Sequence, residues 1–341
     1  MAARGLKVAV VTIDPARRLA NALGLERLGN EPHLVDPALF APHGMEIRGE
    51  LWALMLDSKR TFDELIARVA PNDRARDDVL GNRIYQELSS AVAGSQEFTA
   101  IAKLYELDRD GDFDLIVLDT PPSRNALDFL DAPDRLTGFL QGRAIRMFLR
   151  PAGIGGKVLG AGTGVVFSLL RRVTGVDLLD DLSVFFRSMG GMIDELADRG
   201  RHVKALLGDP ATTFLLVSSL ERDPVEETIF FHQRLREQSL PFGGLIVNRV
   251  RQVAPPAGSD LAESLTEDLG ADLARRVART AVEAATLATR DAAGLAKLRL
   301  ALGDPPVVSV PQLPGDVHDL EGLAHVCEHL FGEGGRVAAV V

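Results

Sequence analysis

The chain has 341 residues, of which 46% are apolar, enough for one large α/β domain or two ordinary ones. It carries 38 basic and 48 acidic residues, a net charge of −10, and no Lys/Arg cluster interleaved with aromatic residues, which argues against nucleic acid as a partner. Its single cysteine, Cys327, excludes an internal disulfide and a Cys-x-x-Cys metal site, and it fits a reducing, cytoplasmic compartment.

Short apolar runs rich in β-branched residues predict strands along the chain. Each run carries consecutive apolar residues, which is typical of parallel strands that helices bury on both faces. Helical patterns alternate with these runs, so the sequence predicts an α/β fold with a doubly wound, mostly parallel sheet. The predicted strands cover 6–13, 113–119, 213–219, 243–248 and 306–310, with 51–57 as a weaker sixth candidate.

Capping and breaking residues indicate where the helices begin and end. Asp14 with Pro15 predicts a helix start and Gly24 its end, while Ser123 predicts the cap of a helix that stops before Pro133. Further helical patterns cover 79–108, 224–238, 258–298 and 319–331.

The interval between the second and third of these strong strands is too long for one crossover helix. We therefore expect an inserted helical subdomain at about 133–210, within a single domain that spans 1–341. Its longest nearly uncharged run, 158–170, is shorter than the roughly 18 to 20 residues that span a bilayer, so no transmembrane segment is expected. Packing within the subdomain explains this apolar run more simply than binding to a membrane surface, which is the alternative.

Two predicted strands end in aspartate, Asp14 and Asp119. A buried strand followed by Asp119 and Thr120 has the form of a Mg²⁺-site switch, and Asp14 could orient a water for attack on a phosphate. Each alone is also explained as a turn or helix-cap residue. Because the carboxyl ends of parallel strands meet at one edge of a sheet, where ligands bind, their coincidence favours a site.

Other strand ends carry features that suit a nucleotide, although no complete phosphate-binding motif is present. Asn248 follows a buried strand, and its amide offers a donor and an acceptor to a base edge, although alone it is also explained as a turn residue at a strand end. A proline-containing loop follows the last predicted strand and could lie against a base. The pattern G-x-x-x-x-G-K-[ST] does not occur in the sequence, and its nearest decoy, "GIGGKV" at 153–158, lacks a preceding strand.

Taken together, these blocks resemble the ArsA and Get-type ATPases, deviant-Walker P-loop NTPases that include arsenite-pump ATPases and the targeting factor for tail-anchored membrane proteins. "TIDPARRLANALG" is similar to their switch I and "VLDTPPSRNALDFLDAP" to their switch II. "SSLERDPVEET", "GLIVNRV" and "VPQLPGDVHDLEGL" resemble their nucleotide-side segments. The blocks run in order from about residue 6 to 331.

The resemblance implies a P-loop NTPase-like fold, ATP and Mg²⁺ as cofactors, and a homodimer driven by ATP hydrolysis. It makes Asp14 the catalytic, water-orienting carboxylate and places Asp119 and Thr120 in the second shell of Mg²⁺. The helical insertion would then serve an apolar protein client or a membrane-associated partner. The nucleotide contacts that it implies are Glu221, Asn248, Pro311 and Leu313.

Four departures from the family pattern bear on this expectation. Switch II reads Pro122-Ser123-Arg124-Asn125, and Arg17 stands where the family has His. The family's zinc- and arsenite-binding cysteines are absent. The family's phosphate loop precedes switch I by about 25 to 30 residues, whereas only "MAARG" precedes the switch I strand in the sequence as given. We therefore expect an ATPase whose sequence as given is N-terminally incomplete; the alternative is a non-hydrolysing scaffold that binds a protein partner.

Overall fold

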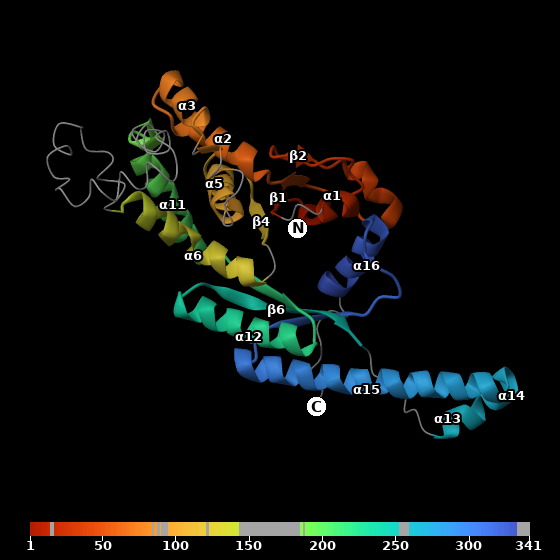
Figure 1. Cartoon of the computed structure of the whole chain (residues 1–341). Helices are drawn as coiled ribbons and strands as arrows, with labels where there is room; N and C mark the ends of the chain where they lie inside the picture. Colours follow the sequence, from red (N-terminus) through yellow and green to blue (C-terminus); the bar gives the residue numbers. More distant parts are fainter. Residues whose placement is uncertain are drawn as a thin grey trace. The chain divides into compact units, whose positions relative to one another are not determined.

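The computed structural model describes residues 1–13, 17–83, 85–86, 89, 95–120, 123–142, 185–186, 188–251 and 259–332. The chain forms two compact units. The first contains Met1–Asn21 and Leu25–Leu206, and the second contains Ala22–Gly24 and Leu207–Val341. Each unit is built around a sheet of its own (Figure 1). This division into two units does not test the expected single domain at 1–341, which stays a prediction.

The sheet of the first unit has the order β2-β3-β1-β4. Strands β1 (Lys7–Thr12), β3 (Glu50–Met55) and β4 (Leu115–Asp119) are parallel, and they confirm the strands predicted at 6–13, 51–57 and 113–119. The two-residue β2 (His33–Leu34) is antiparallel to β3 and is too short to leave a periodic pattern. The central β1 buries most of its side chains, including Val8, Ala9 and Val11.

The sheet of the second unit has three parallel strands in the order β5-β6-β7. They are β5 (Phe214–Ser218), β6 (Phe242–Val250) and β7 (Val307–Pro311), as the sequence predicts. One face packs against α12 (Arg222–Glu237) and α15 (Ala271–Leu302). That core contains Leu220, Val225, Leu245, Val247, Leu298 and Leu302. The α/β class with mostly parallel strands is thus confirmed.

Burial on both faces holds for β1 but is wrong for β4 and β5. Val117 on β4 is 42% exposed, while Leu215 and Val217 on β5 are 55% and 65% exposed. Within the described ranges each of these strands pairs on one side only, β4 with β1 and β5 with β6. Consecutive apolar residues in these two strands therefore do not reflect burial on both faces.

The helices that follow the first strands correct two expectations. Because Gly81 caps α3, the predicted helix 79–108 is interrupted and α5 begins at Ser95. The helix that starts at Ser123 continues past Pro133, although proline removes one backbone donor. Among the described residues, the helices before the second sheet whose ends are defined are α1 (Arg18–Ala22), α2 (Ser58–Val69), α3 (Asp73–Leu80), α5 (Ser95–Asp110), α6 (Ser123–Leu140) and α11 (Ile193–Leu207), with 3-10 turns η1 (Ala2–Arg4), η2 (Pro37–Leu39) and η3 (Ala41–His43).

The predicted helical insertion at about 133–210 is described only at its two ends. There, α6 and α11 are helical, whereas the apolar run at 158–170 lies outside the described residues. Phe185, Met189 and Met192 are buried in a core with residues of α2 and α3. In the part of the chain that the structure describes, no helix is long and apolar enough to cross a membrane.

The second unit confirms two predicted helices, whereas a third predicted helix is divided into three. α12 and α16 (Leu320–Phe331) match 224–238 and 319–331, and Asp319 caps α16 by accepting a hydrogen bond from the Gly322 N–H. The pattern at 258–298 divides into α13 (Ser259–Ser264), α14 (Thr266–Leu269) and α15. Gly270 separates the last two because its φ of 76° does not continue a right-handed helix.

Candidate functional site

The carboxyl edge of the first sheet carries the aspartate that ends β4. Asp119 and Thr120, which end this strand and follow it, are exposed. The register of β1 and β4 places Thr12 directly opposite Asp119, and the Thr12 hydroxyl donates to Asp119 Oδ2 over 2.9 Å. The Ile13 N–H donates to the Asp119 carbonyl over 3.4 Å. Asp14, the expected catalytic carboxylate, lies outside the described residues.

The same edge includes the end of β3. The Leu56 N–H donates to the Thr12 carbonyl over 3.0 Å, which fixes this strand end beside β1. Asp57 then caps α2, because its Oδ1 accepts a hydrogen bond from the Arg60 N–H over 2.8 Å. No helix is predicted from the sequence at 58–69, so this capping role of Asp57 emerges from the structure.

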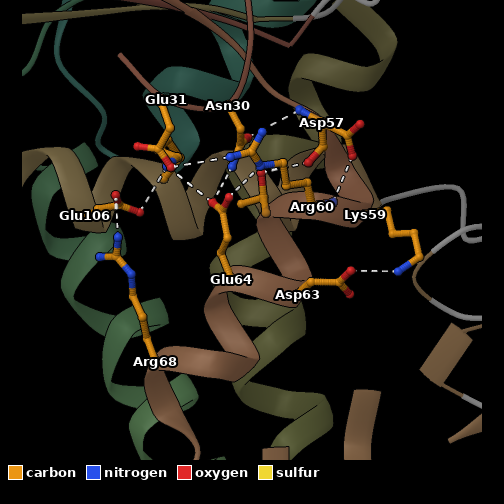
Figure 2. A network of polar contacts seen from close by, with 11 residues as sticks. Asn30, Glu31, Asp57, Lys59, Arg60, Asp63, Glu64, Arg68 and Glu106 are labelled. Atoms are coloured by element: carbon orange, nitrogen blue, oxygen red, sulfur yellow. Dashed lines mark hydrogen bonds and ion pairs between the residues drawn. The ribbon is translucent and has the colours of Figure 1, made fainter. Parts of the chain in front are cut away.

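A polar network that includes Asp57 joins α2 to α5 (Figure 2). Asn30 donates from Nδ2 to Glu64 Oε2 over 2.6 Å, and its Oδ1 accepts a hydrogen bond from the Thr61 hydroxyl over 2.7 Å. The ammonium of Lys103, whose side chain is fully buried, lies 3.1 Å from Glu106 and 4.0 Å from Glu64. The network pairs its buried cation and amide internally, which is the arrangement of a structural support.

The carboxyl edge of the second sheet brings together the other expected site residues. Glu221 is the exposed N-cap residue of α12, and its side chain accepts no capping hydrogen bond. Asn248 is an exposed residue near the end of β6, Pro311 ends β7, and Leu313 follows two residues later. A hydrogen bond of 2.9 Å from the Gln312 N–H to the carbonyl of Val250 holds the β6 and β7 ends together.

The end of β6 has an irregular backbone, because its register with β7 shifts between Val247 and Val250. Arg249 adopts a φ of 59°, in the left-handed region that non-glycine residues seldom occupy. Asn248 Oδ1 accepts a hydrogen bond from the Arg249 N–H over 2.9 Å, so its amide nitrogen remains to donate to a ligand. Buried Asp291 on α15 accepts hydrogen bonds from the N–H of Arg251 over 2.9 Å and from its guanidinium over 3.1 Å.

The structure therefore divides the expected site residues into two groups. Asp119 and Thr120 lie at the edge of one sheet, whereas Glu221, Asn248, Pro311 and Leu313 lie at the edge of the other. Across the described ranges, no three His, Cys, Asp or Glu side chains are grouped so that they could hold a metal ion.

Comparison with known proteins identifies the family. The family model of the anion-transporting ATPases, the ArsA ATPase family, matches residues 1–256. The chain belongs to this family. The match contains Asp14, Asp119, Glu221 and Asn248, whereas Pro311 and Leu313 lie beyond it.

This chain is also similar to several individual ATPases. An ATPase ASNA1 homolog of Cryptosporidium parvum is 24% identical over 267 residues, which cover 76% of this chain and 62% of the relative. The ATPase get3 of Aspergillus terreus is 24% identical over 74% of this chain and 66% of its own length. The ATPase ARSA1 of Chlamydomonas reinhardtii is 26% identical over 73% of this chain and 31% of its own length. The chain thus spans less than two thirds of each of these relatives.

Proposed function

We propose that the protein binds ATP with Mg²⁺ and hydrolyses it in a cytoplasmic homodimer that acts on a client or an anion. One observation carries the proposal: in a chain of an ATPase family, β4 ends in an exposed carboxylate that a neighbouring strand holds by a side-chain hydrogen bond. Mg²⁺ takes oxygen ligands and keeps several waters, so a carboxylate at this position suits it. The family's description and the relatives' names as ATPases support the same conclusion.

The proposed roles follow the two sheet edges. Asp119 and Thr120 would hold the water shell of Mg²⁺, and the bound ion would supply charge neutralisation at the phosphates. Asp14 orients the attacking water as a general base would. On the second sheet, the Asn248 amide nitrogen donates to the base, and the remaining nucleotide contacts are Glu221, Pro311 and Leu313.

A phosphate-binding loop is also needed for this function. Because G-x-x-x-x-G-K-[ST] does not occur in the 341 residues, we propose that the loop comes from a segment outside them. In the described part of the first sheet, the side of β4 away from β1 is unpaired. A parallel strand added there would end near Asp119 and could lead into such a loop. Reading the gene upstream of the Met1 codon tests this source, since a stop codon before any in-frame loop contradicts it.

Calorimetry and phosphate release test ATP binding and turnover. In a chain that includes the loop, Asp119→Asn is expected to lower turnover about 10- to 100-fold, because the amide is a poorer acceptor for a Mg²⁺-bound water. Asp73→Asn is the matched control, since Asp73 is an exposed residue of α3 that pairs with Arg76. Equal turnover in Asp119→Asn and wild type contradicts the proposed Mg²⁺ role.

The second candidate is a binding protein that has lost hydrolysis and uses its helical subdomain to hold an apolar protein partner or a membrane-associated one. It is favoured by the missing loop motif and by Ser123-Arg124-Asn125 in switch II. In the 341-residue chain, micromolar ATP binding with turnover excludes the scaffold. If the upstream reading finds no loop, partner binding without any ATP effect supports it.

A further inference from the structure

Thr12 is a buried polar residue that ends β1, directly after the apolar run 8–11. Its side chain is 2% exposed, and a buried hydroxyl costs free energy unless it forms a hydrogen bond. The Thr12 hydroxyl meets that requirement by donating to Asp119 Oδ2 over 2.9 Å. Hydrogen bonds to ionised acceptors are stronger than those between neutral groups, so this contact restrains the carboxylate.

The backbone fixes Thr12 on both sides. β1 pairs it with Asp119 of β4 and with Met55 of β3, and its carbonyl accepts a hydrogen bond from the Leu56 N–H. A β-branched threonine also has few χ1 rotamers. The hydroxyl is therefore a donor whose position is set by the sheet, whereas the Asp119 carboxylate that it contacts is exposed.

We propose that Thr12 is a positioning residue that orients the Asp119 carboxylate toward the Mg²⁺ of a bound nucleotide. This inference rests on the proposed ATPase function. Thr12 engages Oδ2 and leaves Oδ1 to accept a hydrogen bond from a Mg²⁺-bound water. Among the described residues, Thr12 makes the one side-chain hydrogen bond to Asp119, so its loss should affect ligand geometry more than stability.

The first test needs no ligand. The ¹³Cγ resonance of Asp119 at pH 7.5 is expected to move in Thr12→Val, which removes the donor but keeps the branched shape, and to return in Thr12→Ser. Thr61→Val is the matched control, because Thr61 is also buried and donates to Asn30 elsewhere in the same unit. An Asp119 resonance that stays unchanged in Thr12→Val overturns the proposed contact.

The second test measures the affinity for Mn²⁺ with ATP by electron paramagnetic resonance, in a chain that includes the phosphate loop. Thr12→Val is expected to weaken the affinity about 10-fold, as removal of an outer-shell partner does, and Thr12→Ser to restore it. Thr61→Val should lower thermal stability without changing the affinity, which separates positioning from a purely structural role.

The outcomes distinguish this inference from the proposed function. If Asp119→Asn weakens Mn²⁺ binding but Thr12→Val does not, the positioning role is overturned and the proposed function stands. If the wild-type protein binds no Mn²⁺ with ATP, the proposed function fails, and the positioning role for Mg²⁺ fails with it.

Discussion

Asp291 is a charged residue that the fold buries next to the β6 end. Its carboxylate is paired with the N–H and the guanidinium of Arg251, and this pairing holds the segment that follows Asn248 and Arg249. Sequence patterns found Asn248 because a polar residue after an apolar run is a local signal. They missed Asp291 because its partner lies 40 residues away in the chain. Thr12 was missed for a related reason, since its role depends on the β1–β4 register.

Replacing Arg251 by methionine should destabilise the second unit. The variant keeps the backbone N–H bond but leaves the buried Asp291 carboxylate without its cation, which costs about 1–3 kcal/mol in the free energy of unfolding. Urea denaturation measures the loss. Arg222→Met is the control, because Arg222 is 86% exposed and pairs with Glu226 on the same helix. Equal stability of the two variants would show that the buried pair contributes nothing.

The buried His232 on α12 should make the free energy of unfolding depend on pH. It is 5% exposed and meets Phe242 edge-on at 4.7 Å, and burial, with a smaller effect of the Arg236 charge, lowers its pKa below 6.5. The unfolded chain therefore binds this proton more readily than the folded chain. The stability that depends on neutral, buried His232 is complete above about pH 6.5 and is lost as the pH falls through the pKa of the folded state. His232→Phe should flatten the profile between pH 7 and 5. Parallel profiles for variant and wild type contradict this.

At the scale of elements, strands were predicted better than helices. Strands such as β1 and β6 are short apolar runs, and their pattern survives in the folded sheet. The helical pattern did not reveal that Gly81 and Gly270 interrupt long helices, because the neighbouring residues still have apolar periodicity. Pro133 gave the opposite error, because it predicts a helix end and α6 continues through it.

The contact between α2 and α5 depends on a buried cation. Lys103→Met removes the charge that lies between Glu64 and Glu106, so the two carboxylates lose their shared partner. Because each carboxylate keeps an arginine, Arg60 or Arg68, we expect a loss of about 1–3 kcal/mol in the free energy of unfolding. Lys59→Met is the matched control: Lys59 is 52% exposed and pairs with Asp63 on α2, and its loss should cost less than about 1 kcal/mol. Similar denaturation midpoints for the two variants would refute the role assigned to Lys103.

Each of the two units contains a sheet whose outer strand exposes apolar side chains. β4 and β5 each have one neighbour in the described ranges, and both expose apolar side chains. The sequence predicted these strands correctly but not their exposure, because a strand's neighbours are a property of the assembled sheet. Unpaired N–H and C=O groups beside apolar side chains are a template for pairing with another chain.

Val217 on β5 allows self-association through the unpaired strand edge to be measured in the 341-residue chain. Val217→Lys places a charge on the open edge and is expected to reduce self-association, as charged residues on edge strands do in natural sheets. Leu300→Lys is the control, because Leu300 is 86% exposed but lies on α15, where the backbone is already hydrogen-bonded. Light scattering against protein concentration compares the three proteins. A reduction that is equal in both variants would assign association to exposed apolar area alone, whereas a reduction confined to Val217→Lys assigns it to the open strand.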